Sequence, residues 1–182
     1  MHESFPQKLA FTDLETTNMW PPEGEIIEIG LIVADTTTLE VLDRLNLKIR
    51  PQHVTTANAD ALRVNGYTAE QWRDAVPLDT ALRQYIEKAH GAALCAWRVA
   101  FDFAFLQAAM HDAGLLPAGH QTTQICVYSM ALQALRLENI QPFRLKNVGK
   151  FLSLASELEP HQAINGAEQA LAIYKKLQGY SD

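Results

Sequence analysis

The segment FTDLETT at residues 11–17 carries two carboxylates, Asp13 and Glu15, just after the expected start of a strand at residues 8–10. Side chains alternate between the two faces of a strand, so Asp13 and Glu15 point to the same side. Two acids at the end of a buried strand repel each other and are costly to remove from water. A divalent cation with oxygen ligands would neutralise them. The pattern therefore predicts a metal site, with two surface acids at a strand end as the alternative.

A second acid, Asp102, follows a short apolar run at residues 94–97 and lies in the first turn of an expected helix over residues 101–113. In open α/β sheets, sites form outside the carboxyl ends of the strands. Asp102 is therefore placed to approach Asp13 and Glu15 if the two strands are neighbours. The alternative is an acid that only stabilises the start of its own helix.

A third candidate is His161, which follows Pro160 and opens the last expected helix in the segment HQAINGA at residues 161–167. A histidine beside a metal cluster could act as a general base on water. Taken alone, His161 is more typical of a surface histidine.

A sheet and several helices must position these residues. Residues 26–34 are rich in β-branched side chains and residues 39–49 alternate between apolar and polar, so with the first strand they predict an antiparallel meander. Further strands are expected at residues 92–97 and 122–127, and helices from residue 68 and at residues 78–89, 101–113, 128–137, 145–154 and 163–177. We expect an α/β fold with a mixed five-stranded sheet flanked by helices, in a single domain over residues 1–182.

Composition limits the classes of protein that fit. With 48% hydrophobic and 20% charged residues, the chain resembles an ordinary soluble protein. Apolar stretches stay well short of the roughly 20 residues of a membrane helix, so we expect no membrane association and a cytoplasmic location. Cys95 and Cys126 lie in apolar surroundings and are expected to be free thiols. The net charge of −6 argues against a broad basic surface for long nucleic acid, but permits local contact at a metal cleft.

Residues 11–17, 101–106 and 161–167 resemble, in order and spacing, the three motifs of the DEDDh 3′–5′ exonucleases. These are DnaQ-like enzymes with an RNase H-like fold. Residues 26–30 and 64–68 extend the resemblance over nearly the whole chain. The resemblance implies release of nucleoside 5′-monophosphates from single-stranded DNA or RNA 3′ ends. It also makes a homodimer an expectation, because dimers are common among the small members.

The resemblance implies a role for each motif residue. Two Mg²⁺ or Mn²⁺ ions, roughly 3.5–4 Å apart, would clamp the scissile phosphate. Asp13 would bridge both ions, Glu15 would hold the first, and Asp102 would serve the second, mostly through water. His161 would take the proton from the attacking water. The residues expected to border the terminal nucleotide are Thr16, Thr17, Asn18, Met19 and Asn65, with Asn18 in a place where the family usually has a glycine and where asparagine tolerates a left-handed turn.

The chain departs from the family pattern at two places. Gly166 stands where the third motif has an aspartate, which removes one ligand from the first metal, and Trp97-Arg98 replaces a His-Asn pair that is common before the second motif. Glu168 or Asn165 could take over as a ligand, although a helical step of about 100° per residue turns both away from the direction of residue 166. Arg98 could instead supply positive charge near the phosphate, with only one ion bound tightly. The remaining account is an impaired member that binds nucleic-acid ends or a protein partner.

Overall fold

A mixed five-stranded sheet forms the centre of the computed structural model, which describes residues 6–115, 123–154 and 162–180. The strands are β1 (Lys8–Thr16), β2 (Ile26–Asp35), β3 (Val41–Lys48), β4 (Ala92–Ala96) and β5 (Gln124–Cys126), in the order β3-β2-β1-β4-β5. The first three strands are antiparallel neighbours, whereas β4 runs parallel to β1 and β5 parallel to β4. The predicted meander and mixed sheet are therefore confirmed, and β1 lies in the middle of the sheet.

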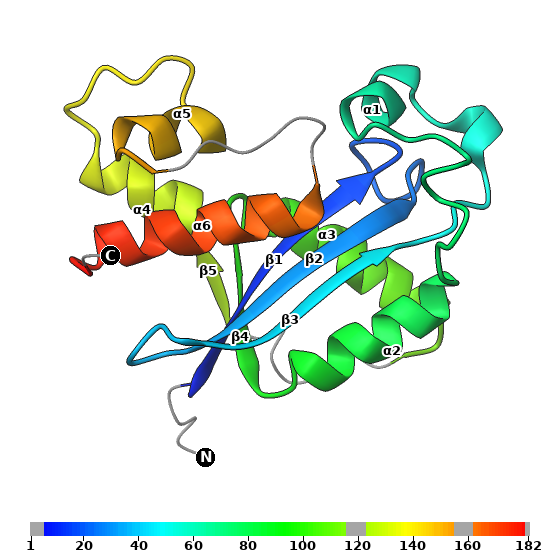
Figure 1. The fold of residues 1–182 in the computed structure, drawn as a ribbon, viewed down its shortest axis with the longest axis horizontal. Coiled ribbons are helices and arrows are strands. Elements are labelled where there is room, and N and C mark those ends of the chain that lie inside the picture. The colour runs from blue at the N-terminus through cyan, green and yellow to red at the C-terminus, as the bar shows by residue number, and fades with distance from the viewer. Residues whose placement is uncertain (1–5, 116–122, 155–161, 181–182) are drawn as a thin grey trace.

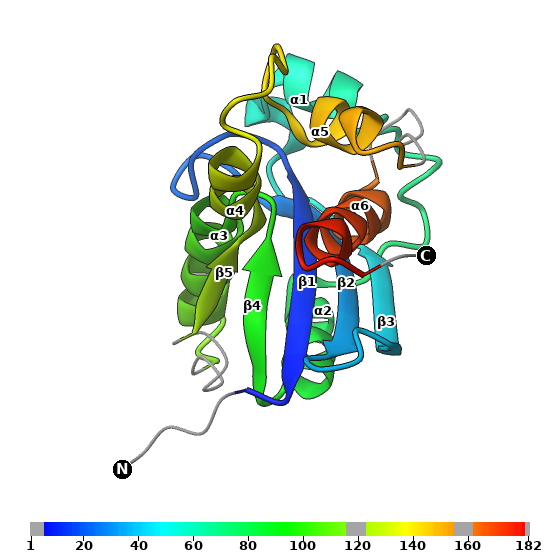
Figure 2. The same cartoon turned by 90° about the vertical axis from the view of Figure 1, so that its left-hand side faces the viewer.

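Helices cover both faces of this sheet (Figures 1 and 2). They are α1 (Ala59–Val64), α2 (Leu78–Lys88), α3 (Val99–Asp112), α4 (Val127–Ala134), α5 (Leu145–Phe151) and α6 (Ala163–Leu177), with a 3₁₀ turn η1 at Val54–Thr56. Leu14 faces α2 and α3 in one apolar cluster, and Phe11 faces α4, α5 and α6 in the other. This division follows from the two-residue alternation of side chains along β1.

The helix predicted from Thr68 is wrong. The Thr68 hydroxyl does accept the backbone N–H of Gln71, as a helix cap would, but residues 69–74 form turns. Trp72 explains the difference, because its indole N–H donates to the carbonyl of Ile27 and the side chain is buried against that strand. Val76 then pairs in extended form with Ile49. Tertiary contacts thus override a local helix signal at Thr68.

Helix α1 was not predicted from the sequence. It is capped by Asn58, whose side chain accepts two backbone N–H groups.

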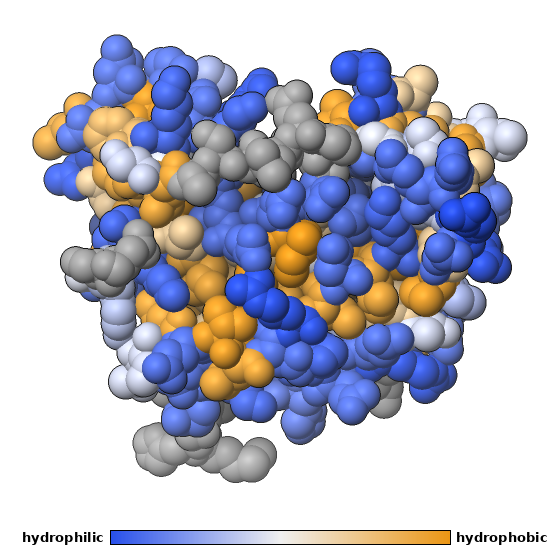
Figure 3. Space-filling view, in the orientation of Figure 1, coloured by the Kyte–Doolittle hydropathy of each residue, from blue (hydrophilic) through white to orange (hydrophobic). Residues whose placement is uncertain are grey.

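Hydrophilic residues dominate the face shown in Figure 3, and apolar residues appear among them in separate groups. One such group lies over α1, at the upper right of the view, near the end of β1. Among the described residues, no helix is long and apolar enough to cross a membrane. Both cysteines are free, with Cys95 buried and Cys126 half-buried, as predicted.

Candidate active site

Asp13 and Glu15 are half-buried on the face of the sheet that α6 covers. In the register of β1 with β2, Asp13 lies opposite Gly30 and Glu15 lies opposite Glu28. Directly opposed residues of an antiparallel pair share a face, so three carboxylates gather around one end of the β1–β2 pair.

Helix α6 crosses this face so closely that little or no room is left for a side chain at two glycines. A Cβ on Gly30 would overlap the backbone of Ala163 and Ile164. A Cβ on Gly166 would lie 2.6 Å from Cγ of Asp13 and closer still to its carboxylate oxygen. The space that a longer side chain at position 166 would need is therefore held by the carboxylate of Asp13.

Asp102 lies in the first turn of α3, as the sequence predicts. Its side chain is buried, and burial raises the pKa of Asp102 to about 8, with a further increase from the negative charge of Glu15. The backbone N–H groups of Asp102 and Leu14 donate to the carboxylate and lower the pKa in part. Oδ1 has no hydrogen-bond partner among the described residues. Asp102 thus lies beside β1 and next to Glu15, with one buried oxygen facing no donor.

Glu28 is a site residue that sequence reasoning missed. It is only 1% exposed, and burial raises its pKa, although Lys48 on β3 and the backbone N–H of Ala163 act in the opposite direction. Its Oε2 has no hydrogen-bond partner among the residues the structure describes. The available signal was a charged residue inside the otherwise apolar run of residues 26–34, two positions before Gly30.

Glu28→Gln is expected to keep the hydrogen bond that attaches the start of α6 to β2, whereas Glu28→Ala is expected to remove it and destabilise the folded chain. The glutamine carbonyl can still accept the N–H of Ala163, and its amide places a donor next to Glu15. Alanine leaves that N–H unpaired, at a cost of about 1–3 kcal/mol in the free energy of unfolding. Urea unfolding at pH 7 measures both variants. An equal loss of stability in the two would mean that the hydrogen bond to Ala163 does not carry the effect.

The donor set at this site consists of carboxylate oxygens, which suit Mg²⁺ or Mn²⁺. Within residues 6–115, 123–154 and 162–180, no three His, Cys, Asp or Glu side chains stand in an arrangement that could hold a metal ion. The carboxylate of Asp13 lies against Gly166, and His161 falls outside the described residues. The partnerless buried oxygens of Asp102 and Glu28 nevertheless fit a site completed by a cation, because buried carboxylates need a positive partner.

A cavity of about 740 Å³ lies at Asp13 and Glu15, and we call it the acidic cavity. Its lining includes Asp13 and Glu15 at the end of β1, and four of the five residues predicted to border a nucleotide: Thr16, Asn18, Met19 and Asn65. Thr17 is not among them, because its hydroxyl accepts the backbone N–H of Glu25 and it lines a neighbouring cavity. The remaining walls come from α1, from Phe101 and from residues 144–146.

Buried hydrogen bonds shape the rim of the acidic cavity. The amide of Asn65 donates to the carbonyl of Thr16 at 3.0 Å, and the hydroxyl of Thr16 donates to the carbonyl of Asn18 at 2.7 Å. Asn18 accepts the backbone N–H of Met19 through its side chain. Its backbone is not left-handed, since the non-glycine residues with positive φ in the described chain are Leu39 and Ser153. Asn18 thus turns the chain with a side-chain hydrogen bond and without a left-handed backbone.

None of the proposed substitutes for the missing aspartate lines the acidic cavity. Glu168 forms an exposed ion pair with Arg44 of β3. Arg98 stacks over the ring of Tyr128, 4.5 Å from the ring centroid. Asn165 is half-buried on α6 and is also absent from the lining. Two other acids lie in this region: Asp60 of α1 lines the acidic cavity, and Glu28 is buried opposite Glu15.

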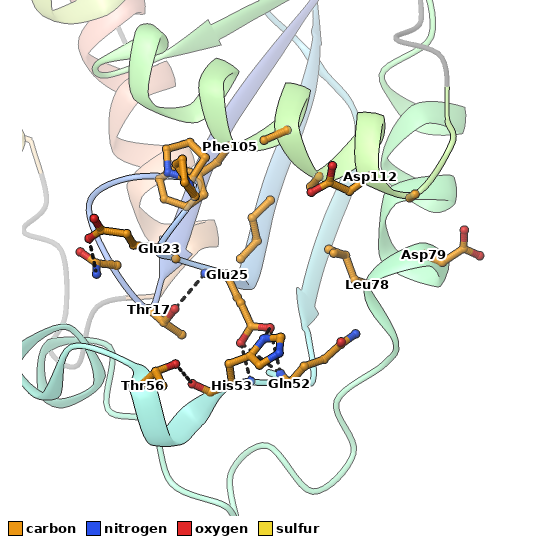
Figure 4. Close-up of a pocket in the computed structure, with 18 residues that line it drawn as sticks. Thr17, Glu23, Glu25, Gln52, His53, Thr56, Leu78, Asp79, Phe105 and Asp112 are labelled. Atoms are coloured by element: carbon orange, nitrogen blue, oxygen red, sulfur yellow. Dashed lines mark hydrogen bonds and ion pairs between the residues drawn. The ribbon is translucent and has the colours of Figure 1, made fainter.

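A larger cavity of about 910 Å³ lies beyond the β1–β2 loop and shares Asn18 with the acidic cavity. Figure 4 shows Glu25 in this cavity, where it accepts the backbone N–H groups of Gln52 and His53 and pairs with the His53 ring. Glu23, Asp79 and Asp112 also line it. Glu25 is already paired with His53 and Asp79 with Arg83, and no lysine or arginine among the described residues lines this cavity to contact a phosphodiester. Cavity size therefore does not identify the functional site here.

Comparisons with known proteins agree with the geometry. A family model described as Exonuclease, of the RNase T type, matches residues 10–174. The PolC-type DNA polymerase III of Caldanaerobacter subterraneus subsp. tengcongensis is 22% identical over 165 residues, which cover 91% of this chain and 11% of the relative. The chain therefore spans about a tenth of the length of that curated relative.

Two solved structures illustrate the fold. E. coli exonuclease I in complex with a dT13 oligonucleotide gives a TM-score of 0.80 at 17% identity, covering 94% of this chain and 41% of that one. The nuclease domain of 3′hExo, a DEDDh family member bound to rAMP, gives 0.78 at 20% identity, covering 97% and 94%. These likenesses confirm the RNase H-like fold.

The family model extends from β1 into α6 and so spans the elements that carry the three motifs. The chain is a member of the RNase T exonuclease family.

Proposed function

We propose that this protein is a metal-dependent 3′–5′ exonuclease that releases nucleoside 5′-monophosphates from single-stranded ends. The observation that supports the proposal is that Asp13 and Glu15 of β1 line one cavity, while the buried Asp102 of α3 lies close enough to Glu15 for their charges to interact. Asp102 destabilises the folded chain, because it is a buried acid whose Oδ1 has no hydrogen-bond partner among the described residues. Binding of a cation would explain why an acid stands at this position.

In this proposal, Asp13, Glu15 and Asp102 hold Mg²⁺ or Mn²⁺, which when bound polarises the scissile phosphate and lowers the pKa of the attacking water. His161 accepts the proton from that water. Asn65 and Thr16 fix the rim against which the terminal nucleotide lies, through the hydrogen bond between them. The 3′hExo domain was solved with rAMP, a nucleoside 5′-monophosphate, which supports this class of product. The cytoplasmic location, the single domain and the homodimer stay predictions of the sequence.

A second candidate function is binding without turnover, either of a nucleic-acid end or of a protein partner. Gly166 favours it, because the third motif offers no carboxylate and Asp13 fills the adjoining space. Retained binding of a 3′ end without release of nucleotides would support this candidate.

The Asp13→Asn variant tests the proposed reaction. With a 5′-labelled single-stranded oligonucleotide and Mn²⁺, the wild-type chain is expected to shorten the substrate stepwise from its 3′ end. Asp13→Asn should lower the rate by at least about 10²-fold, because the site loses a negative ligand where charge develops. Glu70→Gln, which removes an exposed acid outside the acidic cavity, is the matched control. Undiminished release by Asp13→Asn would place the reaction elsewhere.

A further inference from the structure

The acidic cavity has walls of different chemistry around its acidic floor. Met19 and Val64 contribute exposed apolar side chains, with 66% and 41% of their surface accessible. Arg144 and Lys146 line the cavity as well, and no other lysine or arginine of the described residues does so. The acids of the floor and this pair of cations therefore meet in one cavity.

The fold holds this pair of cations in a fixed place. Arg144 is extended and directly precedes α5, and Lys146 lies in the first turn of that helix. Val148 anchors the helix in the core, and Gly149 lies so close to Gln169 of α6 that a Cβ would overlap the amide of that side chain. The side chain of Asn147 donates to the carbonyl of Pro142 at 2.8 Å and ties the preceding loop to α5. The side chains of Arg144 and Lys146 are therefore exposed, while the backbone that carries them is held by the packing of α5 on α6.

Arg144 and Lys146 offset the negative charge that a nucleic-acid strand would meet in the acidic cavity. The chain has a net charge of −6, and the acidic cavity also contains Asp13, Glu15 and Asp60. A nucleic-acid strand that enters it meets like charge at the floor, so the phosphates that stay outside the catalytic centre need local cations. Arginine and lysine are the side chains that contact phosphates in this way, arginine often through two parallel hydrogen bonds.

This inference rests on the proposed function. We propose that Arg144 and Lys146 bind the phosphates of nucleotides that precede the scissile one, while Val64 contacts their bases. Contacts to phosphates and to the faces of bases carry no sequence information, so this subsite accepts any single strand. It also makes the enzyme distinguish a strand from an isolated mononucleotide ester, because only the strand has a second phosphate to offer.

The first test measures how salt affects binding. A fluorescein-labelled dT8 oligonucleotide with phosphorothioate linkages serves as the probe, with Mg²⁺ present. For single strands, each lost phosphate contact lowers the slope of log Kd against log salt by roughly 0.7, so Arg144→Gln/Lys146→Gln should lower it by roughly 1.4. The control Arg136→Gln/Lys150→Gln removes the same charge from exposed positions outside the acidic cavity and should leave the slope nearly unchanged.

The second test separates strand recognition from chemistry. For a p-nitrophenyl ester of thymidine 5′-monophosphate, the double variant should keep the kcat/KM of the wild-type chain. For a dT8 strand with ordinary linkages, its KM should rise roughly tenfold at physiological salt. An unchanged salt slope, an equal loss on both substrates, or failure of the wild-type chain to bind the strand would overturn the inference. Salt-dependent binding through Arg144 and Lys146 with no hydrolysis of either substrate would overturn the proposed function alone.

Discussion

The Asp102→Asn variant is expected to unfold at a higher temperature than the wild-type chain in metal-free buffer at pH 8 and above, and to have lost nuclease activity. The carboxylate is buried, its Oδ1 has no partner in the described structure, and it lies next to the negative charge of Glu15. An asparagine carbonyl can accept the N–H of Leu14, and the asparagine amide places a donor where Oδ1 now stands. Stability and activity are thus expected to change in opposite directions at this residue.

The direction of the pH effect follows from the pKa. In the folded chain the pKa of Asp102 is raised from the ordinary 3.8 to about 8. Between these two values the folded state holds a proton that the unfolded state has released, so the free energy of unfolding falls as the pH rises. The slope is at most about 1.4 kcal/mol per pH unit. The wild-type penalty is complete above pH 8 and absent well below pH 4, on the order of several kcal/mol at its largest.

Thermal unfolding followed by circular dichroism, at pH 5 and pH 9 with EDTA, measures this effect. The advantage of Asp102→Asn should be much larger at pH 9 than at pH 5. Asp112→Asn changes an exposed acid at the other end of α3 and should show no such dependence. Adding Mn²⁺ should raise the melting temperature of the wild-type chain more than that of Asp102→Asn. If Asp102→Asn were the less stable protein at pH 9, burial would not dominate the energetics of this carboxylate.

Gly166→Asp is expected to raise the Mn²⁺-dependent rate by roughly 10²-fold, the scale on which one group that stabilises transition-state charge acts. The new side chain has two effects at once. It supplies the carboxylate that the third motif lacks, and its Cβ displaces the carboxylate of Asp13, whose Cγ lies 2.6 Å from the position of that Cβ. Rotation of Asp13 away from α6 turns it toward the cavity that Glu15 also lines.

Gly166→Ala separates these two effects, because alanine supplies the Cβ without the ligand. We expect Gly166→Ala to gain no activity, and Mn²⁺ titration calorimetry to show tighter binding only for Gly166→Asp. Equal gains in both variants would assign the effect to the displacement of Asp13. If neither variant gains, the missing carboxylate does not limit the rate, which would favour the candidate that binds without turnover.

Much of the fold could be predicted because strong local patterns coincide with tertiary structure. The β-branched run of β2 and the apolar spacing of α6 gave both elements with bounds close to those observed. The turn after Thr68 could not be predicted in this way, since it depends on Trp72 reaching the carbonyl of Ile27 on a distant strand. Local capping chemistry formed as expected there, but the helix did not follow.

The candidate site shows the same division. Asp13, Glu15 and Asp102 could be grouped from sequence because each lies at the end of a strand or the start of the following helix, and β1 and β4 are parallel neighbours. Glu28 and the contact between Asp13 and Gly166 could not, because they depend on how closely α6 approaches the sheet. The close approach of α6 to the sheet depends on Gly30 in β2 and Gly166 in α6 together, and neither glycine alone predicts it from the sequence.

The close backbone contact between α6 and β2 limits which substitutions the fold accepts. At Gly30 the sheet meets the backbone of Ala163 and Ile164 with no side chain between them. Main-chain atoms are the same in every residue, so substitutions elsewhere in the core cannot make up for a side chain added at Gly30. Ala170, farther along α6, is buried against the sheet by side-chain packing, so a larger residue there is expected to cost stability, while the backbone contact at Gly30 fixes the distance of the first turn of the helix from the strands.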